Sequence, residues 1–480
     1  MNSLWKAGDS ARVELDGSTY ALVTDTETGE RRLMVRGNTS GFEGIGQGGG
    51  LPVLCSLTPA NAAELRRRLA WLNPSPLGLR TSAGFGDRLG VATPGHIAAV
   101  RDTGVAPIFA QQSVRENTRT GRTPQQVLDD AMWSVFAEGW RDAWGADADH
   151  LKTPDVIPNF ADAGYTFFTI DPGDHVDDAA EQDDLAVLRA KAEALDWATL
   201  DSSVSAAQQA YQRTFELDGL TLTFDEHALF KALAKYGAAV AHTVRMTRQL
   251  QSSMAGRPFE MEMSVDETGT TTSLHEHLFF AAELTRLHVP FVSLAPRFVG
   301  RFEKGVDYIG DLRELDANIA GHAAIIRYFG NRYKLSLHTG SDKFGVYPIA
   351  MRHTNGLVHL KTAGTSYLEA LRLMASVNPV LFRQVLDFAR ERYETDRKTY
   401  HVSALLDRVP AAQLLNDADL PGLLDQFDAR QVLHVTFGSV LDRFGVELAE
   451  MLRAHRAAYT DYIKRHFDKH LNAFRQTPNG

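Results

Sequence analysis

Histidine, lysine and acidic side chains recur at the ends of short apolar segments of this 480-residue chain. Five segments carry them in order: YTFFTIDPGDH at 165–175, FEMEMSVDET at 259–268, FVSLAPRF at 291–298, YKLSLHTGSDK at 333–343 and GLVHLKTAGTSY at 356–367. Each is typical of a buried strand that is followed by a loop with polar, chemically capable residues. Parallel α/β sheets bind ligands at the carboxyl ends of their strands. The pattern therefore predicts one shared pocket and indicates an enzyme.

Period-two alternation assigns the polar side chains of these strands to one face. The segment 260–266 alternates two glutamates, a serine and an aspartate with methionines and a valine. Ser336 shares a face with His338, and His359 shares one with Lys361. Because an unpaired buried carboxylate is costly, the polar faces predict the pocket side of each strand.

Two histidines and one or two carboxylates from different strands can bind a divalent metal ion with an open coordination position. The ligand set that we predict is Glu262, His338 and His359, completed by Asp171 or His175. For each histidine the alternative is a hydrogen-bonded structural role.

Lys361 and Asp171 are the predicted proton-transfer residues. Lys361 follows His359 on the same face, where a lysine can form a Schiff base, donate a proton or neutralise a developing enolate. Its structural alternative is an ion pair with a carboxylate of segment 260–266. Asp171 ends its strand and is a candidate base.

Glycine-containing loops at 82–96, 340–345 and 363–367 suit the binding of polar substrate oxygens. The substrate-binding residues that we predict there and nearby are Asp87, Arg88, Arg297, Lys343 and Thr365. The cations among them, with Arg301, can pair with a substrate carboxylate or serve as structural charges. No segment has the phosphate P-loop pattern, and GFGDRLG lacks the full dinucleotide fingerprint, so NAD binding is not predicted.

Composition excludes several other classes of protein. A net charge of −10 argues against a general nucleic-acid binder. Cys55 is the only cysteine, so an internal disulfide and a thiolate-rich metal site are excluded. No apolar run approaches the roughly 20 residues of a membrane span, and the first residues lack a secretory pattern. We expect a cytoplasmic protein with no membrane partner; a homo-oligomer is compatible with the sequence, which does not give the oligomeric state.

The elements that would position these residues follow a strand, loop and helix pattern from Leu77 onward. Eight strands are predicted, at 77–84, 105–112, 146–152, 165–171, 259–266, 290–297, 334–340 and 357–363. The third has the weakest pattern. Eight strands favour a closed (β/α)₈ barrel of the TIM type, an α/β fold, over an open sheet.

Three regions are expected along the chain. Residues 1–75 predict a small α+β segment, with a hairpin turning near Thr28 and a helix capped by Thr58. Residues 76–368 predict the catalytic barrel, with a helical insertion of two or three helices at about 178–257. Residues 369–480 predict a helical region packed on the barrel.

Several long motifs resemble the tagaturonate epimerase family, to which tagatose/fructose 4-epimerases are related: GFGDRLGVATPGH, FTIDPGDH, SVDET, LAPRFVGRFEKGVDYIGD, LSLHTGSDKFGVYP and HLKTAGTSYLEALR. The resemblance runs from about Leu77 to Arg372. It implies a TIM-barrel-like enzyme that depends on a divalent metal ion such as nickel, zinc or manganese. The implied reaction interconverts D-tagaturonate and D-fructuronate in hexuronate catabolism.

The resemblance also implies roles for the residues found above. Glu262, His338 and His359 would hold the metal ion, and Asp171 or Lys361 would transfer the proton. The uronate carboxylate would be held by Arg88, Arg297 or Lys343.

The inverted hydroxyl carbon of tagaturonate lies β to the ketone, so its C–H bond is not acidified directly. A retro-aldol cleavage, rotation of the fragment and re-addition would give the other epimer. This path needs a Lewis acid, a base for the β-hydroxyl proton and a closed pocket. A transient oxidation would need a bound nicotinamide, for which the chain shows no motif.

Three alternative functions remain open from the sequence. The same barrel could act on the neutral ketohexoses fructose and tagatose. It could be an aldolase or lyase that releases its fragments. From a different class, it could be a noncatalytic sugar-binding barrel.

Overall fold

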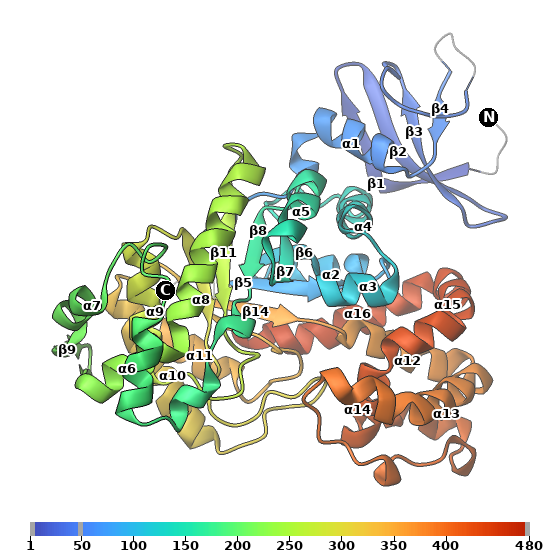
Figure 1. Cartoon of the computed structure of the whole chain (residues 1–480). Helices are drawn as coiled ribbons and strands as arrows, with labels where there is room; N and C mark the ends of the chain where they lie inside the picture. The colour runs from blue at the N-terminus through green and yellow to red at the C-terminus, as the bar shows by residue number, and fades with distance from the viewer. Residues whose placement is uncertain (1–4, 47–50, 476–480) are drawn as a thin grey trace.

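The computed structural model describes residues 5–46 and 51–475, and its centre is a closed barrel of eight parallel strands (Figure 1). In chain order these are β5 (Ser82–Gly86), β6 (Ala106–Ser113), β7 (Gly145–Leu151), β8 (Phe167–Ile170), β11 (Glu260–Ser264), β12 (Phe291–Ala295), β13 (Lys334–Leu337) and β14 (Val358–Thr362). Each overlaps one of the predicted strands, and β14 pairs with β5 to close the ring. The predicted TIM-type fold is confirmed.

Helices surround the barrel between successive strands. Two of them begin with a capping box, formed by Thr123 with Gln126 and by Ser273 with Glu276, which satisfies free N–H groups of the first turn. The helices of this layer are α2 (Thr93–Val100), α3 (Val114–Thr120), α4 (Pro124–Ala137), α5 (Ile157–Ala163), α9 (Leu274–Arg286), α10 (Leu312–Tyr328), α11 (Tyr347–Thr354) and α12 (Thr365–Val377).

Two buried charged side chains, Glu260 and Lys334, close the amino ends of the strands. The Glu260 carboxylate accepts hydrogen bonds from the backbone N–H of Leu77, at 2.9 Å, and of Gly78. Lys334 donates to the Gly78 carbonyl and to Ser82 Oγ, both at 2.9 Å. The two glutamates on one face of β11 therefore have different places. Glu260 binds backbone groups at the amino ends of the strands, which form the barrel floor, and Glu262 lies toward the carboxyl ends.

The N-terminal region forms a small antiparallel sheet of β1 (Trp5–Leu15), β2 (Ser18–Asp25), β3 (Arg31–Arg36) and β4 (Val53–Cys55). The turn between β2 and β3 lies where the hairpin was predicted. Helix α1 (Pro59–Arg68) follows, and Thr58 caps it by accepting the N–H of Asn61 at 3.3 Å. Figure 1 shows this sheet projecting to one side of the barrel, in blue.

The long interval between β8 and β11 contains α6 (Leu185–Glu193), α7 (Val204–Tyr211) and α8 (Glu226–Met254), in agreement with the predicted helical insertion. It also contains a hairpin that was not predicted, β9 (Thr214–Leu217) with β10 (Leu220–Thr223). The hairpin was missed because the whole interval was assigned to helices, and its four-residue strands lie between them. Its turn uses Gly219 at a φ of +74°, a conformation that glycine adopts without strain.

The C-terminal region consists of α13 (Pro379–Asp396), α14 (Phe427–Val435), α15 (Phe437–Ala454) and α16 (Arg456–Leu471), with short 3₁₀ turns between α13 and α14. These helices pack beside the barrel, and α16 contacts both α2 and α12 (Figure 1). Along residues 5–46 and 51–475, no helix combines the length and apolar character needed to cross a bilayer.

Candidate active site

A buried ammonium group lies at the carboxyl ends of the strands. Lys361, on β14, places Nζ 2.8 Å from Asp147 Oδ2, 2.6 Å from Asp149 Oδ1 and 2.9 Å from Glu262 Oε1, and it also donates to Thr169 Oγ1. These residues come from β7, β8, β11 and β14. The barrel thus brings three carboxylates around one cation, because inward-pointing side chains of successive strands meet at its mouth.

Burial and mutual charge decide the protonation of this group. Burial alone would lower the pKa of Lys361, but the three carboxylates raise it well above its usual value. Burial raises the pKa of Asp147 to about 7, against the attraction of Lys361. Burial would also raise the pKa of Glu262, but Lys361 and His338 hold it well below the usual range. Lys361 is therefore protonated in the resting site.

His338 lies between two carboxylates. Its Nε2 is 2.6 Å from Glu262 Oε1, and its Nδ1 is 3.1 Å from Asp266 Oδ1. Burial would lower the pKa of His338, but these two acids raise it to about 9. The imidazole thus shares its two protons with these carboxylates.

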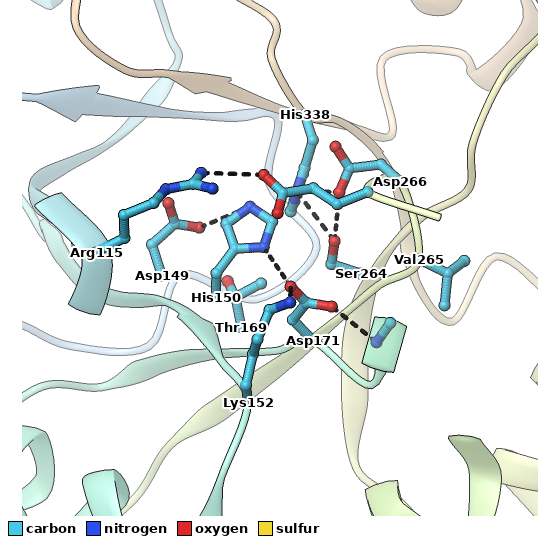
Figure 2. A network of polar contacts seen from close by, with 12 residues as sticks. Arg115, Asp149, His150, Lys152, Thr169, Asp171, Ser264, Val265, Asp266 and His338 are labelled. Carbon is cyan, nitrogen blue, oxygen red and sulfur yellow. Dashed lines mark hydrogen bonds and ion pairs between the residues drawn. The ribbon is translucent and has the colours of Figure 1, made fainter. Parts of the chain in front are cut away.

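His150 extends the cluster from β7 and packs against His338, with ring centroids 5.1 Å apart (Figure 2). Its Nδ1 is 3.1 Å from Asp171 Oδ2, and Asp171 Oδ1 accepts the N–H of Gly173 at 2.9 Å. Despite burial, nearby acids led by Asp149 raise the pKa of His150 to about 10. Asp171 therefore orients an imidazole at the mouth.

The donor atoms at the mouth suit a divalent cation. One ring nitrogen each from His150 and His338 and an oxygen of Asp266 lie within 4.8 Å of one another. His150, Asp171 and Glu267 form a second, overlapping group of the same kind. Imidazole and carboxylate donors are the ligands that nickel, zinc and manganese accept.

Two adjoining cavities open onto this cluster. The larger has a volume of 360 Å³ and the smaller, deeper one 30 Å³. The larger is bordered in part by segment 400–403 of the C-terminal region. Lys361 and Asp149 line the smaller cavity. The residues that line both cavities are Arg115, Lys304, His338, Thr339 and Tyr400.

The predicted metal ligands divide into two groups. Glu262 and His338 meet at the mouth. His359 instead lies two residues nearer the barrel floor than Lys361, where its Nδ1 is 2.8 Å from Ser82 Oγ. Burial lowers the pKa of His359 to about 3, so its imidazole is neutral. His175 lies outside the cluster and stacks on His242, with ring centroids 4.0 Å apart.

Three predicted substrate cations border the cavities, and one of them, Arg301, lines the larger cavity 3.7 Å from Glu303 Oε1. Arg88 lines the smaller cavity, but its guanidinium is 2.8 Å from Glu116 Oε1 and covers the ring of Phe437. Arg297 lines the larger one and donates to the Asp266 carbonyl at 3.3 Å.

The other predicted substrate residues do not line either cavity. Lys343 Nζ is buried and donates to the carbonyls of Glu303, at 2.8 Å, and Ser341, at 3.1 Å. Asp87 accepts three backbone N–H groups of the turn that follows it. Thr365 is buried at the start of α12. Their loops fold back on themselves, which strand alternation cannot reveal.

Sequence reasoning missed Asp147, Asp149, His150, Arg115 and Lys304. The alternation of ADADH in the third strand was a usable signal for the two aspartates. It could not identify His150, because a register shift between Ala148 and Leu151 and a φ of +51° at His150 turn this side chain to the mouth.

The fold and this mouth define a TIM-barrel enzyme with an acid, imidazole and ammonium site. The family model for tagaturonate epimerase matches residues 13–474. A tagaturonate/fructuronate epimerase of Thermotoga maritima is 43% identical over 420 residues, which cover 87% of this chain and 85% of the relative.

Solved structures agree with this relationship. The native crystal structure of the fructuronate-tagaturonate epimerase UxaE from Cohnella laeviribosi aligns with a TM-score of 0.92 at 34% identity, over 98% of this chain and 97% of that chain. A one-glycerol complex of the same epimerase aligns with a TM-score of 0.91 at 35% identity, over 98% and 96%. The chain belongs to the tagaturonate epimerase family and is an isomerase.

Replacing Lys361 with methionine should lower the free energy of unfolding by about 3–5 kcal/mol, because it leaves three buried carboxylates without their cation. Adding Asp147→Asn should restore part of this loss, since one negative charge is removed. Denaturant titration of the two single variants and the double variant measures the coupling. The control is Lys464→Met, at an exposed ion pair on α16, with an expected change below about 1 kcal/mol. Strictly additive losses would show that Lys361 does not balance Asp147.

Proposed function

We propose that the enzyme interconverts D-tagaturonate and D-fructuronate. The observation that supports this most is the convergence of Glu262, Asp266, His338 and His150 at a cavity whose floor carries Lys361. The family membership and the activity in the names of its relatives support the same substrates. The larger cavity lies within the size range of small-molecule sites, at 360 Å³.

Lys304 is the residue that we propose for binding the uronate carboxylate. It lines both cavities, and its Nζ donates to Thr339 Oγ1 at 2.9 Å. Across the described part of the chain it forms no ion pair with a carboxylate. Arg115, in contrast, is 3.1 Å from Glu267, and Arg88 is paired with Glu116. An ammonium bonded only to a neutral hydroxyl is the cation most available to a substrate anion.

We propose a divalent cation, such as nickel, zinc or manganese, as the cofactor of this mouth. Glu262, His338, Asp266 and His150 would hold it, with Asp171 fixing the orientation of His150 through Nδ1. The fit rests on Glu262 Oε2, a buried oxygen that lacks a hydrogen-bond partner among the described residues, and on the close acid and imidazole donors. When bound, such an ion would act as a Lewis acid toward substrate oxygens. His359 keeps its place at Ser82 in this proposal.

The remaining chemistry falls to Asp149 and Lys361. Asp149 accepts the hydroxyl proton of the inverted carbon while the bond to the neighbouring carbon breaks. The hydroxyl becomes an aldehyde, and the electron pair of the broken bond becomes the enediolate of the other fragment. The aldehyde turns its other face, the bond re-forms, and Lys361 returns a proton to the new alkoxide. Asp149 reprotonates Lys361 across their 2.6 Å contact, so the protons balance.

The borders of the cavity would retain the two fragments. Tyr400 and Ser403 of the C-terminal region border it on one side, and Arg297 and Phe302 border it on another. Retention favours re-addition over release, which separates an epimerase from a lyase.

The proposed activity is tested by incubating purified enzyme with D-tagaturonate and following D-fructuronate by chromatography. Conversion should be abolished by a chelator and restored by one of nickel, zinc or manganese. Glu262→Gln and His338→Ala should lower kcat by about 100-fold or more, since they remove proposed cation ligands. His175→Gln, whose side chain stacks on His242 outside the cluster, is the matched control and should retain activity.

Two results would contradict this function. Full conversion by both ligand variants after chelation would show that the reaction needs neither the cation nor these ligands. Accumulation of free three-carbon fragments would show that the enzyme is a lyase and not an epimerase.

Lys304→Met tests the carboxylate contact. KM for tagaturonate should rise about 10- to 100-fold, because a charged hydrogen bond contributes about 1.5–3 kcal/mol. Turnover of neutral fructose or tagatose should not change, since these sugars lack the carboxylate. The same substitution at Lys464 is the control. An equal loss of activity with charged and neutral substrates would assign Lys304 a structural role. A preference of the wild-type enzyme for fructose over tagaturonate would favour the alternative function, a ketohexose 4-epimerase.

A further inference from the structure

A second cluster of cation-binding side chains lies between the C-terminal helix and the barrel. His466 and His470 are four residues apart on α16, so they lie on one face of the helix. They face Asp342, in the loop after β13. None of the three lines the cavities of the candidate active site. All three are buried.

One ring nitrogen of each histidine faces the same oxygen of Asp342. His466 Nε2 is 3.8 Å from Asp342 Oδ1, and His470 Nε2 is 3.7 Å from the same oxygen. The three atoms lie within the 4.8 Å of one another that a shared ion requires. His466 Nε2 is buried and has no hydrogen-bond partner in the described residues. A buried unsatisfied nitrogen facing a carboxylate oxygen calls for a ligand between them.

Neighbouring groups fix the histidines in the orientation that a metal ligand needs. His470 Nδ1 is 3.0 Å from the His466 carbonyl, and since a carbonyl only accepts, this nitrogen carries the proton. His466 Nδ1 is 3.4 Å from Glu369 Oε1. Both Nε2 atoms are then lone-pair donors. Metal-bound histidines characteristically donate their other N–H to a carbonyl or carboxylate in this way.

One carboxylate oxygen of Asp342 is paired with an arginine, and the other faces the two histidines. Arg430 Nη2 is 2.8 Å from Oδ2, which leaves Oδ1 for the histidines. The backbone of Asp342 has a φ of +62°, an uncommon conformation for an aspartate that turns it toward α16. One existing contact competes, since the Asp342 N–H donates to His470 Nε2 at 2.9 Å. An ion must replace that hydrogen bond.

We propose that Asp342, His466 and His470 form a structural site for a borderline divalent cation such as Zn²⁺. Two nitrogens and one oxygen suit zinc, with water as the fourth ligand from an adjoining hollow of 600 Å³ that Asp342 and His466 line. The site lies in the last turn of α16, where the helix dipole favours positive charge. The ion would fix this helix to the loop that follows His338.

The test uses full-length protein in which both groups of the mouth cluster are disabled by His150→Ala, Glu262→Gln and His338→Ala. After loading with Zn²⁺ and desalting, elemental analysis should find a single zinc ion per chain, and chelation should lower the melting temperature. Adding His466→Gln and His470→Gln should remove the zinc and the effect of the chelator. His455→Gln, an exposed histidine at the start of α16, is the matched control and should keep both.

Cobalt provides a readout that does not depend on how well the histidine variants fold. Co²⁺ added to the mouth-disabled protein should give the visible absorption of a four-coordinate N/O site, and one equivalent of Zn²⁺ should abolish it. Absence of bound zinc and of this absorption would overturn the proposal. So would equal zinc content with and without His466 and His470. Neither result would bear on epimerisation, because the site is separate from the mouth.

Discussion

The placement of three buried carboxylates around the Lys361 ammonium is the constraint on which the rest of the structure depends. Asp147, Asp149 and Glu262 are each exposed by no more than 5%. Without water, each negative charge must meet a cation or a hydrogen-bond donor. A single lysine cannot balance all of them, and His338 and His150 supply the remaining positive charge.

This need for several positive charges links the geometry of the mouth to its proposed chemistry. His338 is held by acids on both ring nitrogens, so the proposed divalent cation would take the place of the proton on one of them. The barrel floor uses a different arrangement, in which Glu260 is satisfied by backbone N–H groups and Lys334 lies nearby. One end of the barrel is thereby closed, and the other remains chemically active. The C-terminal region completes the active end, since Tyr400 borders both cavities.

Much of this fold was predictable from local sequence. The repeated strand, loop and helix pattern marked the eight barrel strands, and period-two alternation placed Glu262, His338 and Lys361 on the polar face. Other features depend on backbone geometry that alternation does not encode. The bulge in β7 turns His150 inward, and the loop after β13 folds Lys343 onto backbone carbonyls.

Contacts between distant segments were the other limit of prediction. His466 and Asp342 are far apart in the chain, and only the packing of α16 brings them together. Lys304 is unremarkable in the sequence, because its place beside two cavities depends on the long loop after β12. The hairpin β9–β10 was missed because it lies in an interval that was assigned to helices.

The proposed carbon–carbon cleavage is tested most directly by running the epimerisation in D₂O and locating deuterium in the product by NMR. Retro-aldol cleavage leaves the hydrogen of the inverted carbon attached throughout, since it passes through an aldehyde whose C–H bond does not ionise. The product should therefore carry no deuterium at that carbon, even after many turnovers. Deuterium incorporation there, at a rate matching epimerisation, would show direct deprotonation and contradict the roles proposed for Asp149 and Lys361.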